Sequence, residues 1–256
     1  MSSKPCPFIW HDLITTDVAA AKAFYAKVIG WNMKSFSPGA DYTVLLAGEI
    51  GVGGIVAIPP DACERGAPAC WQGYVAVDDV DAYAERIKSK GGTILRAAED
   101  IPNVGRFALT ADPQGAVFII FKPGSSEGMP TAAPGTPGLV AWNELHAVDG
   151  LKAFDWYADL FGWTKSWDMD MGAMGVYRLF ATGGEPVGGM MTKMPNMPTP
   201  FWAYYFNVDS INEAIARTHK AGGKVLHGPQ EVPGPMYIAN CQDPQGAFFS
   251  MTSSRL

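Results

Sequence analysis

The chain has 256 residues, of which 48% are apolar and 17% are charged, a balance typical of globular proteins with well-formed hydrophobic cores. Its net charge is -6, and Lys and Arg form no basic run, which argues against nucleic acid and anionic membranes as main partners. We recognise no leader-like N-terminus and no apolar run that approaches the roughly 20 residues of a membrane span. We therefore expect a cytoplasmic protein.

The first half of the chain is predicted to contain two cycles of strand, helix and further strands. Asp17 is a good N-cap and Gly30 a good stop for a helix over residues 18–29. Asp78 is predicted to cap a second helix over residues 80–90, which a glycine pair ends. The predicted strands cover residues 8–13, 42–47, 52–58, 71–77, 93–97, 106–111 and 116–122.

The second half follows the same plan after a segment rich in Pro, Gly, Ser, Thr and Ala. Asp149 and Asp209 precede predicted helices over residues 151–160 and 211–220. The predicted strands cover residues 177–182, 187–192, 224–226, 237–241 and 247–252. Residues 125–137 have the composition of a linker, so we predict two domains, residues 1–124 and 138–256.

Several segments of the first half return in the second. Trp10-His11-Asp12-Leu13 returns as Trp142-Asn143-Glu144-Leu145, and the turn Asp112-Pro113-Gln114-Gly115 returns as Asp243-Pro244-Gln245-Gly246. A repeat of this length indicates a duplicated domain rather than a short solenoid unit. Each copy is then predicted to hold two βαβββ modules.

The four cysteines, Cys6, Cys63, Cys70 and Cys241, have the spacing of neither a zinc site nor a disulfide framework. We expect reduced, structural thiols. Cys63 and Cys70 share one loop, and their pairing under oxidation is left open.

The order of these features resembles the vicinal oxygen chelate superfamily, also called the glyoxalase/bleomycin-resistance/dioxygenase family. The residues that carry the resemblance are Asp17 with Phe24-Tyr25 and Gly30-Trp31, Asp149 with Trp156-Tyr157 and Gly162-Trp163, and the two Asp-Pro-Gln-Gly turns. Among the members of this family, the chain resembles tandem two-domain proteins from mycobacteria and streptomycetes. The resemblance implies an α+β fold with two tandem glyoxalase-like domains. In each, two βαβββ modules form a cup-shaped, incompletely closed barrel.

Metal-dependent members of this family place His or Glu on four strands of the cup, where the metal chelates two neighbouring substrate oxygens. Three of the positions that correspond hold Trp10, Gln72 and Ile119 in the first copy, and Trp142, Ala203 and Ser250 in the second. The remaining position lies in residues 52–58 or 187–193, which contain no His, Asp, Glu or Cys. Divalent metals of this chemistry need several converging nitrogen or oxygen donors. We therefore expect no metal and no other cofactor.

Strand alternation assigns the side chains that face each cup, once those positions are placed. In the first copy these are Trp10, Asp12, Ile14, Gln72, Tyr74, Val117, Ile119 and Phe121. In the second they are Trp142, Glu144, His146, Ala203, Tyr205, Asn207, Phe248, Ser250 and Thr252. The aromatic members either pack into a core or form stacking walls for a flat ligand.

The acidic residues Asp12 and Glu144 occupy equivalent inward positions, where a carboxylate needs a partner. Each is either a hydrogen-bonded structural group or a polar anchor or general base, and Glu144 shares its face with His146. The catalytic candidates are therefore Glu144, His146 and Asp12, and the second, more polar cup is expected to be the better site. The ligand-binding candidates are Trp10, Gln72, Tyr74, Trp142, Tyr205, Asn207 and Ser250.

His11 lies one residue from a ligand position, so it is expected to turn away from the cup as a structural histidine unless a β-bulge intervenes. The Met- and Pro-rich residues 190–200 are interpreted either as a hydrophobic lid or as core filling. The glycine pairs Gly53-Gly54 and Gly188-Gly189 predict a bulge or close backbone packing rather than phosphate binding.

Three functions are compatible with these residues. The first is metal-independent binding of a small, partly aromatic hydrophobic molecule in a cup. The second is a lyase, isomerase or oxygenase-type enzyme that uses the carboxylate and histidine groups. The third is a degenerate structural or interaction protein with filled cups. Because all four modules lie in one chain, a monomer could complete both cups, and a homodimer is the alternative.

Overall fold

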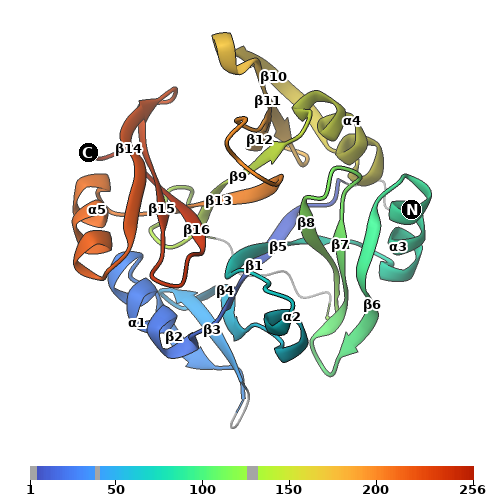
Figure 1. Cartoon of the computed structure of the whole chain (residues 1–256), viewed down its shortest axis with the longest axis horizontal. Coiled ribbons are helices and arrows are strands. Elements are labelled where there is room, and N and C mark those ends of the chain that lie inside the picture. The colour runs from blue at the N-terminus through green and yellow to red at the C-terminus, as the bar shows by residue number, and fades with distance from the viewer. Residues whose placement is uncertain (1–4, 38–40, 126–131) are drawn as a thin grey trace. The chain divides into compact units, whose positions relative to one another are not determined.

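The computed structural model describes residues 5–37, 41–125 and 132–256, in which a similar run of strands and helices occurs twice (Figure 1). The first copy contains the helices α1 (Val18–Val28), α2 (Pro60–Glu64) and α3 (Val80–Ser89). Its strands are β1 (Phe8–Thr15), β2 (Asn32–Ser35), β3 (Tyr42–Ala47), β4 (Ile50–Ala57), β5 (Cys70–Ala76), β6 (Thr93–Ile101), β7 (Gly105–Ala111) and β8 (Val117–Pro123).

The second copy contains the helices α4 (Gly150–Phe161) and α5 (Ile211–Lys220) and the short 3-10 helix η1 (Gly172–Met174). Its strands are β9 (Val140–Ala147), β10 (Thr164–Asp170), β11 (Val176–Ala181), β12 (Pro186–Thr192), β13 (Phe201–Asn207), β14 (Lys224–Val232), β15 (Met236–Gln242) and β16 (Phe248–Ser253). All four predicted long helices are present. Of the predicted linker, residues 126–131 lie outside the described residues.

The helix ends follow from their capping residues. Asp17 accepts a hydrogen bond from the backbone N–H of Ala20 at 2.9 Å, as expected for the N-cap of α1. The prediction for α3 was wrong by one residue, because Asp79 rather than Asp78 caps it. Gly162 ends α4 with φ of +71°, a left-handed conformation that glycine adopts without a Cβ penalty.

The strands form two eight-stranded sheets with equivalent orders, β2-β3-β4-β1-β5-β8-β7-β6 and β10-β11-β12-β9-β13-β16-β15-β14. In both, the first strand of a module pairs in parallel with its last, β1 with β4 and β9 with β12. The sheets do not close on themselves. The arrangement confirms the predicted α+β fold of two tandem copies, each an incompletely closed barrel of two βαβββ modules.

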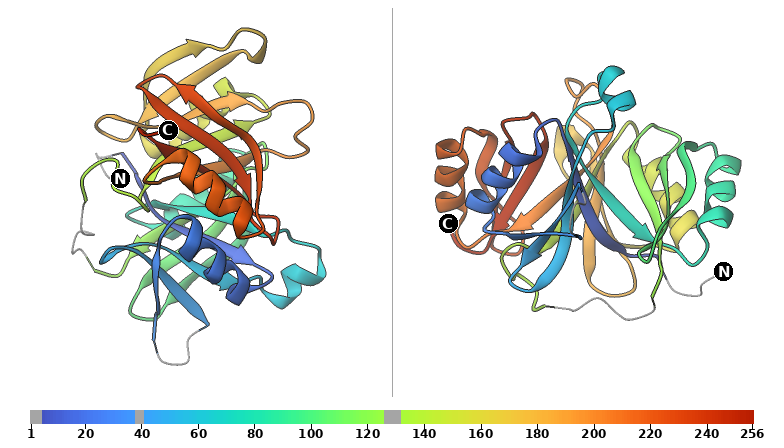
Figure 2. Two further views of the ribbon diagram at one scale, coloured as in Figure 1. Left: turned by 90° about the vertical axis from the view of Figure 1, so that its left-hand side faces the viewer. Right: turned by 90° about the horizontal axis from the view of Figure 1, so that it is seen from below.

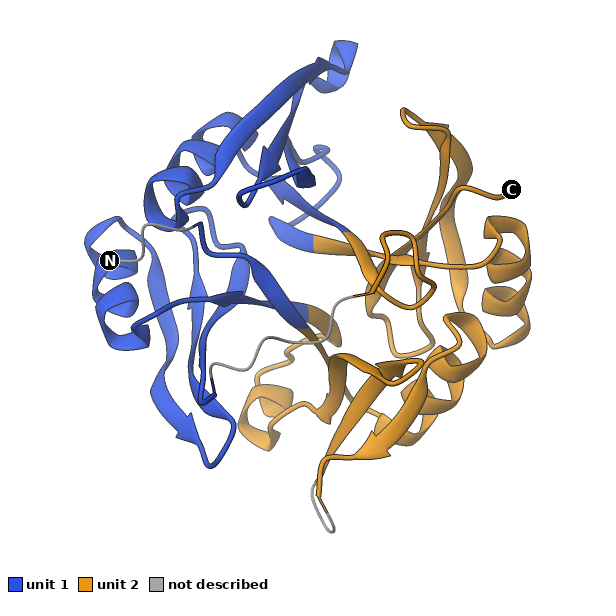
Figure 3. Cartoon of the chain, turned by 180° about the vertical axis from the view of Figure 1, so that it is seen from behind, with its two compact units in different colours: residues 1–10, 72–128, 142–202 blue, residues 11–71, 129–141, 203–256 orange. Residues whose placement is uncertain are grey.

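The chain divides into two compact units that each draw on both copies (Figure 3). Unit 1 comprises residues 1–10, 72–128 and 142–202, and unit 2 comprises residues 11–71, 129–141 and 203–256. Each unit therefore combines one module of the first copy with one module of the second. The division into domains 1–124 and 138–256 follows the repeat and stays a prediction.

The core of unit 1 is built around Tyr157 of α4. Its ring stacks on Trp163 with centroids 5.4 Å apart, and Phe118 of β8 meets it edge-on. The Tyr157 hydroxyl donates to Oδ2 of Asp112 at 3.1 Å and accepts from Nε1 of Trp202 at 3.1 Å. Burial raises the pKa of Asp112, against the lowering effect of its hydrogen bonds.

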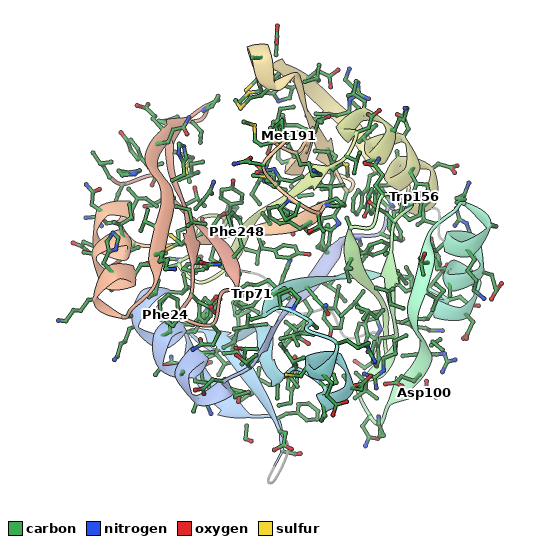
Figure 4. All side chains as sticks on the ribbon, viewed as in Figure 1. Phe24, Trp71, Asp100, Trp156, Met191 and Phe248 are labelled. Atoms are coloured by element: carbon green, nitrogen blue, oxygen red, sulfur yellow. The ribbon has the colours of Figure 1, made fainter. Side chains whose placement is uncertain are left out.

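The core of unit 2 repeats this arrangement around Tyr25 of α1. The Tyr25 hydroxyl donates to Oδ2 of Asp243 at 3.1 Å and accepts from Nε1 of Trp71 at 3.0 Å. Figure 4 labels Trp71 and Phe24, two of the aromatic side chains in this unit. Helices α1 and α5 lie side by side in it (Figure 2), and Nε of Arg217 donates to the carbonyl of Val28. Each aromatic core thus joins a helix of one copy to elements of the other.

The four cysteines, all of them described residues, form no disulfide bond in the structure, and Cys6 and Cys241 are buried. Burial raises the pKa of Cys241 to about 12. None of the described helices has the length and apolar composition that a membrane-spanning helix needs.

Candidate functional site

Strand β9 places Trp142, Glu144 and His146 on one face, because alternate residues of a strand point the same way. These three predicted residues belong to unit 1, together with Tyr177 of β11 and Phe201 of β13. We refer to these five residues as the β9 cluster. Glu144 and His146 are buried, with exposed fractions of 9% and 8%, whereas the other three are partly exposed.

The polar atoms of the β9 cluster form one continuous chain. Nε1 of Trp142 donates to the hydroxyl of Tyr177 at 2.6 Å, and that hydroxyl donates to Oε2 of Glu144 at 2.8 Å. The second carboxylate oxygen, Oε1, lies 2.8 Å from Nε2 of His146. Tyr177 and His146 thus contact the carboxylate directly, and Trp142 orients Tyr177. Polar contacts of this kind keep a buried carboxylate in an apolar surrounding.

The imidazole of His146 has one satisfied and one open nitrogen. Its ring is stacked on Phe201, with centroids 4.9 Å apart and an interplanar angle of 19°. Nδ1 is buried and has no hydrogen-bond partner among the residues that the structure describes. A buried nitrogen without a partner costs free energy, so a polar atom of a bound molecule would stabilise this ring.

Tyr177 reaches Glu144 because the strand between them carries a glycine at the crossing point. The strand order is β11-β12-β9, and Gly189 of β12 lies opposite Glu144. A Cβ on Gly189 would overlap the ring of Tyr177. The Gly188-Gly189 pair therefore marks close packing, as predicted: Gly189 lies against the tyrosine ring and Gly188 against the backbone carbonyl of Asn143.

Unit 2 contains a smaller version of the same arrangement. The hydroxyl of Tyr42 on β3 donates to Oδ1 of Asp12 on β1 at 2.6 Å, across Gly54 of β4. A Cβ on Gly54 would overlap the Tyr42 hydroxyl. At the position that corresponds to His146 stands Ile14, an apolar side chain.

The other predicted site residues lie in different surroundings. In unit 2, Tyr205 lies opposite Ser250 in the pairing of β13 with β16, and the Ser250 hydroxyl donates to Oδ1 of Asn240 at 2.9 Å. Asn207 is buried on the same strand as Tyr205. In unit 1, Tyr74 meets Phe121 edge-on with centroids 5.8 Å apart. Gln72 is buried and Trp10 partly exposed.

The remaining candidates are His11 and the methionine-rich segment of residues 190–200. The His11 ring is buried and packs edge-on against Tyr204, with centroids 4.6 Å apart. Met190 and Met191 are buried in β12, whereas Met194, in the loop that follows, is exposed. The two buried methionines therefore fill the core of unit 1. For these two residues the structure favours core filling over a hydrophobic lid.

The donor set of the family's metal site is not matched by this chain. The corresponding positions carry Trp, Gln, Ile, Ala and Ser side chains, and β4 and β12 contain no His, Asp, Glu or Cys. Among the described residues, no group of three or more His, Cys, Asp or Glu could hold a metal ion. The residues present therefore do not fit a divalent metal of this chemistry.

Sequence reasoning missed Tyr42, Tyr177 and Phe201. A signal for the tyrosines exists, because each begins a predicted strand and stands twelve residues before the second glycine of its pair, Gly54 or Gly189. The repeated combination of a tyrosine and a glycine pair indicates that the tyrosine ring lies over the glycines of the neighbouring strand, which carry no side chain. Phe201 gave no such signal, since its contact with His146 depends on the register of two strands that are far apart in the sequence.

Comparison with known families and sequences gives matches that cover most of the chain. Residues 9–120 and 144–251 match the family described as the Glyoxalase/Bleomycin resistance protein/Dioxygenase superfamily. The "Putative glyoxylase CFP32" of Mycobacterium tuberculosis is 35% identical over 247 residues, which cover 94% of this chain and 92% of that protein. The "Anthracycline biosynthesis protein DnrV" of Streptomyces peucetius is 33% identical over 261 residues, which cover 96% of this chain and 92% of that protein.

Solved structures share the fold at lower identity. The Mn(II)-bound glyoxalase from Novosphingobium aromaticivorans superposes with a TM-score of 0.66 at 17% identity, over 99% of this chain and 83% of that one. The 2,2',3-trihydroxybiphenyl 1,2-dioxygenase from Sphingomonas wittichii strain RW1 gives a TM-score of 0.67 at 13% identity, over 98% of this chain and 91% of that one. At this level of identity the likeness concerns the fold alone.

Proposed function

This chain belongs to the Glyoxalase/Bleomycin resistance protein/Dioxygenase superfamily, and on that premise we propose that it binds a small, partly aromatic hydrophobic molecule without a metal. The observation that carries the proposal is the β9 cluster. Its carboxylate is held from two sides, and the buried Nδ1 of His146 is left for a partner that the described residues do not supply. A site of this kind orients a ligand by one or two polar contacts and holds it by apolar surface.

The ring surfaces of the cluster favour a flat ligand. Trp142, Tyr177 and Phe201 are partly exposed aromatic side chains around the buried Glu144 and His146. Aromatic rings stack on such side chains at centroid distances of about 4.5–7 Å. The relative DnrV is named as an anthracycline biosynthesis protein. The anthracycline nucleus is a flat, partly aromatic ring system with carbonyl and hydroxyl groups. This supports the same ligand class for the present chain.

The binding test uses 1,4-dihydroxyanthraquinone, a flat probe with adjacent carbonyl and hydroxyl oxygens, titrated into the protein by isothermal calorimetry. We expect saturable binding with a Kd on the order of 1–10 μM. The variant His146→Ala should weaken probe binding by about tenfold, since one hydrogen bond between uncharged groups contributes about 0.5–1.5 kcal/mol. The matched control is His219→Ala, a histidine exposed on α5 in unit 2.

Two outcomes would contradict the proposal. Absence of saturable binding in the wild type would favour a structural or interaction protein with filled cups. Unchanged affinity in His146→Ala would place the ligand elsewhere.

Metal independence needs its own measurement. The protein is purified without chelator and analysed by plasma mass spectrometry, with the binding titration repeated after dialysis against EDTA. We expect less than stoichiometric metal and unchanged affinity, because the corresponding positions lack donors. Stoichiometric nickel, zinc, manganese or iron, lost together with probe binding on dialysis, would overturn this part of the proposal.

A further inference from the structure

We propose that Glu144 and His146 form an acid–base dyad, in which Nδ1 of His146 takes a proton from a carbon next to a carbonyl group of the bound molecule. The inference rests on the proposed function, since it assigns a reaction class to the same site. It makes the protein an enzyme of the isomerase or lyase type, with an aromatic ketone as the class of substrate. Nδ1 is the reacting atom, and Glu144 acts through the ring.

The contact with Glu144 determines which nitrogen of His146 is free. A carboxylate only accepts hydrogen bonds, so the 2.8 Å contact between its Oε1 and Nε2 places the ring hydrogen on Nε2. The neutral ring then carries its lone pair on Nδ1, the buried atom without a partner among the described residues. Stacking on Phe201 fixes the plane in which that lone pair lies.

Glu144 is less suited to be the base itself. Its Oε2 accepts from Tyr177, whose hydroxyl accepts in turn from Trp142, and its Oε1 faces His146. A carboxylate held on both oxygens is positioned to stabilise a positive ring rather than to approach a substrate. Glu144 is therefore a positioning residue, and His146 is the group that touches the substrate.

The duplication supplies an internal comparison. In unit 2 the equivalent carboxylate, Asp12, is held by Tyr42 in the same way, yet Ile14 stands where the histidine would be. The scaffold therefore accommodates an apolar side chain at this position. A histidine that only filled space would not need a carboxylate on one nitrogen and an open position on the other. The change from Ile14 in the first copy to His146 in the second, two residues after the carboxylate, indicates a specialised role.

The proposed step is a proton transfer without redox change. The C–H bond breaks, its proton moves to Nδ1, and its electron pair stays on the substrate as an enolate. The imidazolium formed is stabilised by the Glu144 carboxylate through Nε2–H. Return of the proton to a conjugated carbon completes an isomerisation. In an elimination the bond from the β-carbon to the leaving group breaks, and the departing group takes its electron pair and the proton from Nδ1. Neither outcome needs an oxidant, a reductant or a second substrate.

The test follows hydrogen exchange of 2-tetralone, whose C1 methylene lies between an aromatic ring and a carbonyl group. The probe is incubated with the full-length protein in deuterated buffer, and loss of the C1 proton signal is followed by NMR. We expect the wild type to accelerate exchange over buffer by about a hundredfold, the range of general base catalysis. Binding of the same probe is measured in parallel by calorimetry.

Three variants separate catalysis from binding. His146→Gln should bring the rate close to that of buffer, whereas His219→Gln, the same replacement on exposed α5, should leave it unchanged. Glu144→Gln should lower kcat by about tenfold or more with little change in KM, because its amide no longer stabilises a charged ring. Circular dichroism establishes that each variant is folded. If His146→Gln is not folded, the exchange rate of the Glu144→Gln variant decides whether the dyad is catalytic.

The outcomes distinguish this inference from the function on which it rests. Probe binding without accelerated exchange would overturn the dyad and leave the binding function in place. Absence of binding to both 2-tetralone and dihydroxyanthraquinone would overturn both. Exchange that His146→Gln and Glu144→Gln leave unchanged would assign catalysis to other residues and equally overturn the dyad.

Discussion

At the scale of single residues, two buried tyrosine hydroxyl groups hold equivalent places in the two compact units. The hydroxyl of Tyr157 lies between the carboxylate of Asp112 and the indole of Trp202, and that of Tyr25 lies between Asp243 and Trp71. Burial raises the pKa of Tyr25 well above its usual value, so this hydroxyl keeps its proton and donates to the carboxylate. The recurrence of the same three residue types indicates that this network belongs to the scaffold.

Replacing Tyr157 with Phe keeps the ring and removes only the hydroxyl group. We expect the free energy of unfolding to fall by about 1–3 kcal/mol, because a buried carboxylate and a buried indole N–H each lose a partner. Urea unfolding followed by tryptophan fluorescence measures this loss. The control is Tyr237→Phe in β15, a half-buried tyrosine for which we expect a change within about 0.5 kcal/mol. Equal losses in both variants would contradict the expected role of the hydroxyl.

The same scale shows what the sequence could and could not predict about the candidate site. Glu144 and His146 are two residues apart, so strand periodicity alone places them on one face, and the structure brings them into contact. The partnership of Glu144 with Tyr177 crosses an intervening strand and depends on pairing register. Register is a property of the folded sheet, so strand periodicity in the sequence does not identify this partner.

At the scale of elements, the two neighbouring glycines of β12 permit different close contacts. A Cβ on Gly188 would overlap the backbone carbonyl of Asn143 on β9, and a Cβ on Gly189 would overlap the ring of Tyr177. A backbone carbonyl in a paired strand has no room to move, whereas a tyrosine ring can rotate away. The absence of a Cβ at Gly188 therefore allows β12 to pair with β9. The absence of a Cβ at Gly189 allows Tyr177 to reach the β9 cluster.

Alanine substitutions should separate these contacts. We expect Gly188→Ala to lower the free energy of unfolding by about 1–3 kcal/mol, as overpacking does, since β12 must shift from β9. Gly189→Ala should cost less stability and instead weaken probe binding by about tenfold, because Tyr177 leaves Glu144. Chemical unfolding and calorimetry on both variants measure the two effects. Equal stability losses with unchanged binding would refute the distinction.

Elements with a strong local signal were predicted well and exposed ones were not. The helices α1, α3, α4 and α5 combine an N-terminal cap with a buried face, and each was placed within a few residues. The strands β2 and β10 are almost wholly exposed, so they lack the alternation that marks a half-buried strand. For α3, adjacent Asp78 and Asp79 look alike in sequence, and only the hydrogen bond to Ala82 decides between them.

At the scale of the whole molecule, duplication supplied two copies that exchange modules. Each compact unit takes one βαβββ module from each copy. In unit 2 the helix α1 of the first copy donates, through Tyr25, to Asp243 of the second, and in unit 1 the indole of Trp163 donates to the carbonyl of Cys6 at 2.6 Å. Neither copy alone therefore contains a complete aromatic core, although each contains a complete set of strands for one sheet.

This exchange predicts how separated halves behave. Expressed alone, fragments 1–124 and 138–256 should each lose native near-ultraviolet circular dichroism, because Tyr25 and Tyr157 each lose their carboxylate partner in the other half. Mixed in equal amounts, they should associate and recover a cooperative unfolding transition, since the interface removed by cutting is the interior of both units. Size-exclusion chromatography and thermal unfolding measure association and cooperativity. A fragment 1–124 that unfolds cooperatively on its own, with native aromatic signals, would instead establish the two copies as independent domains.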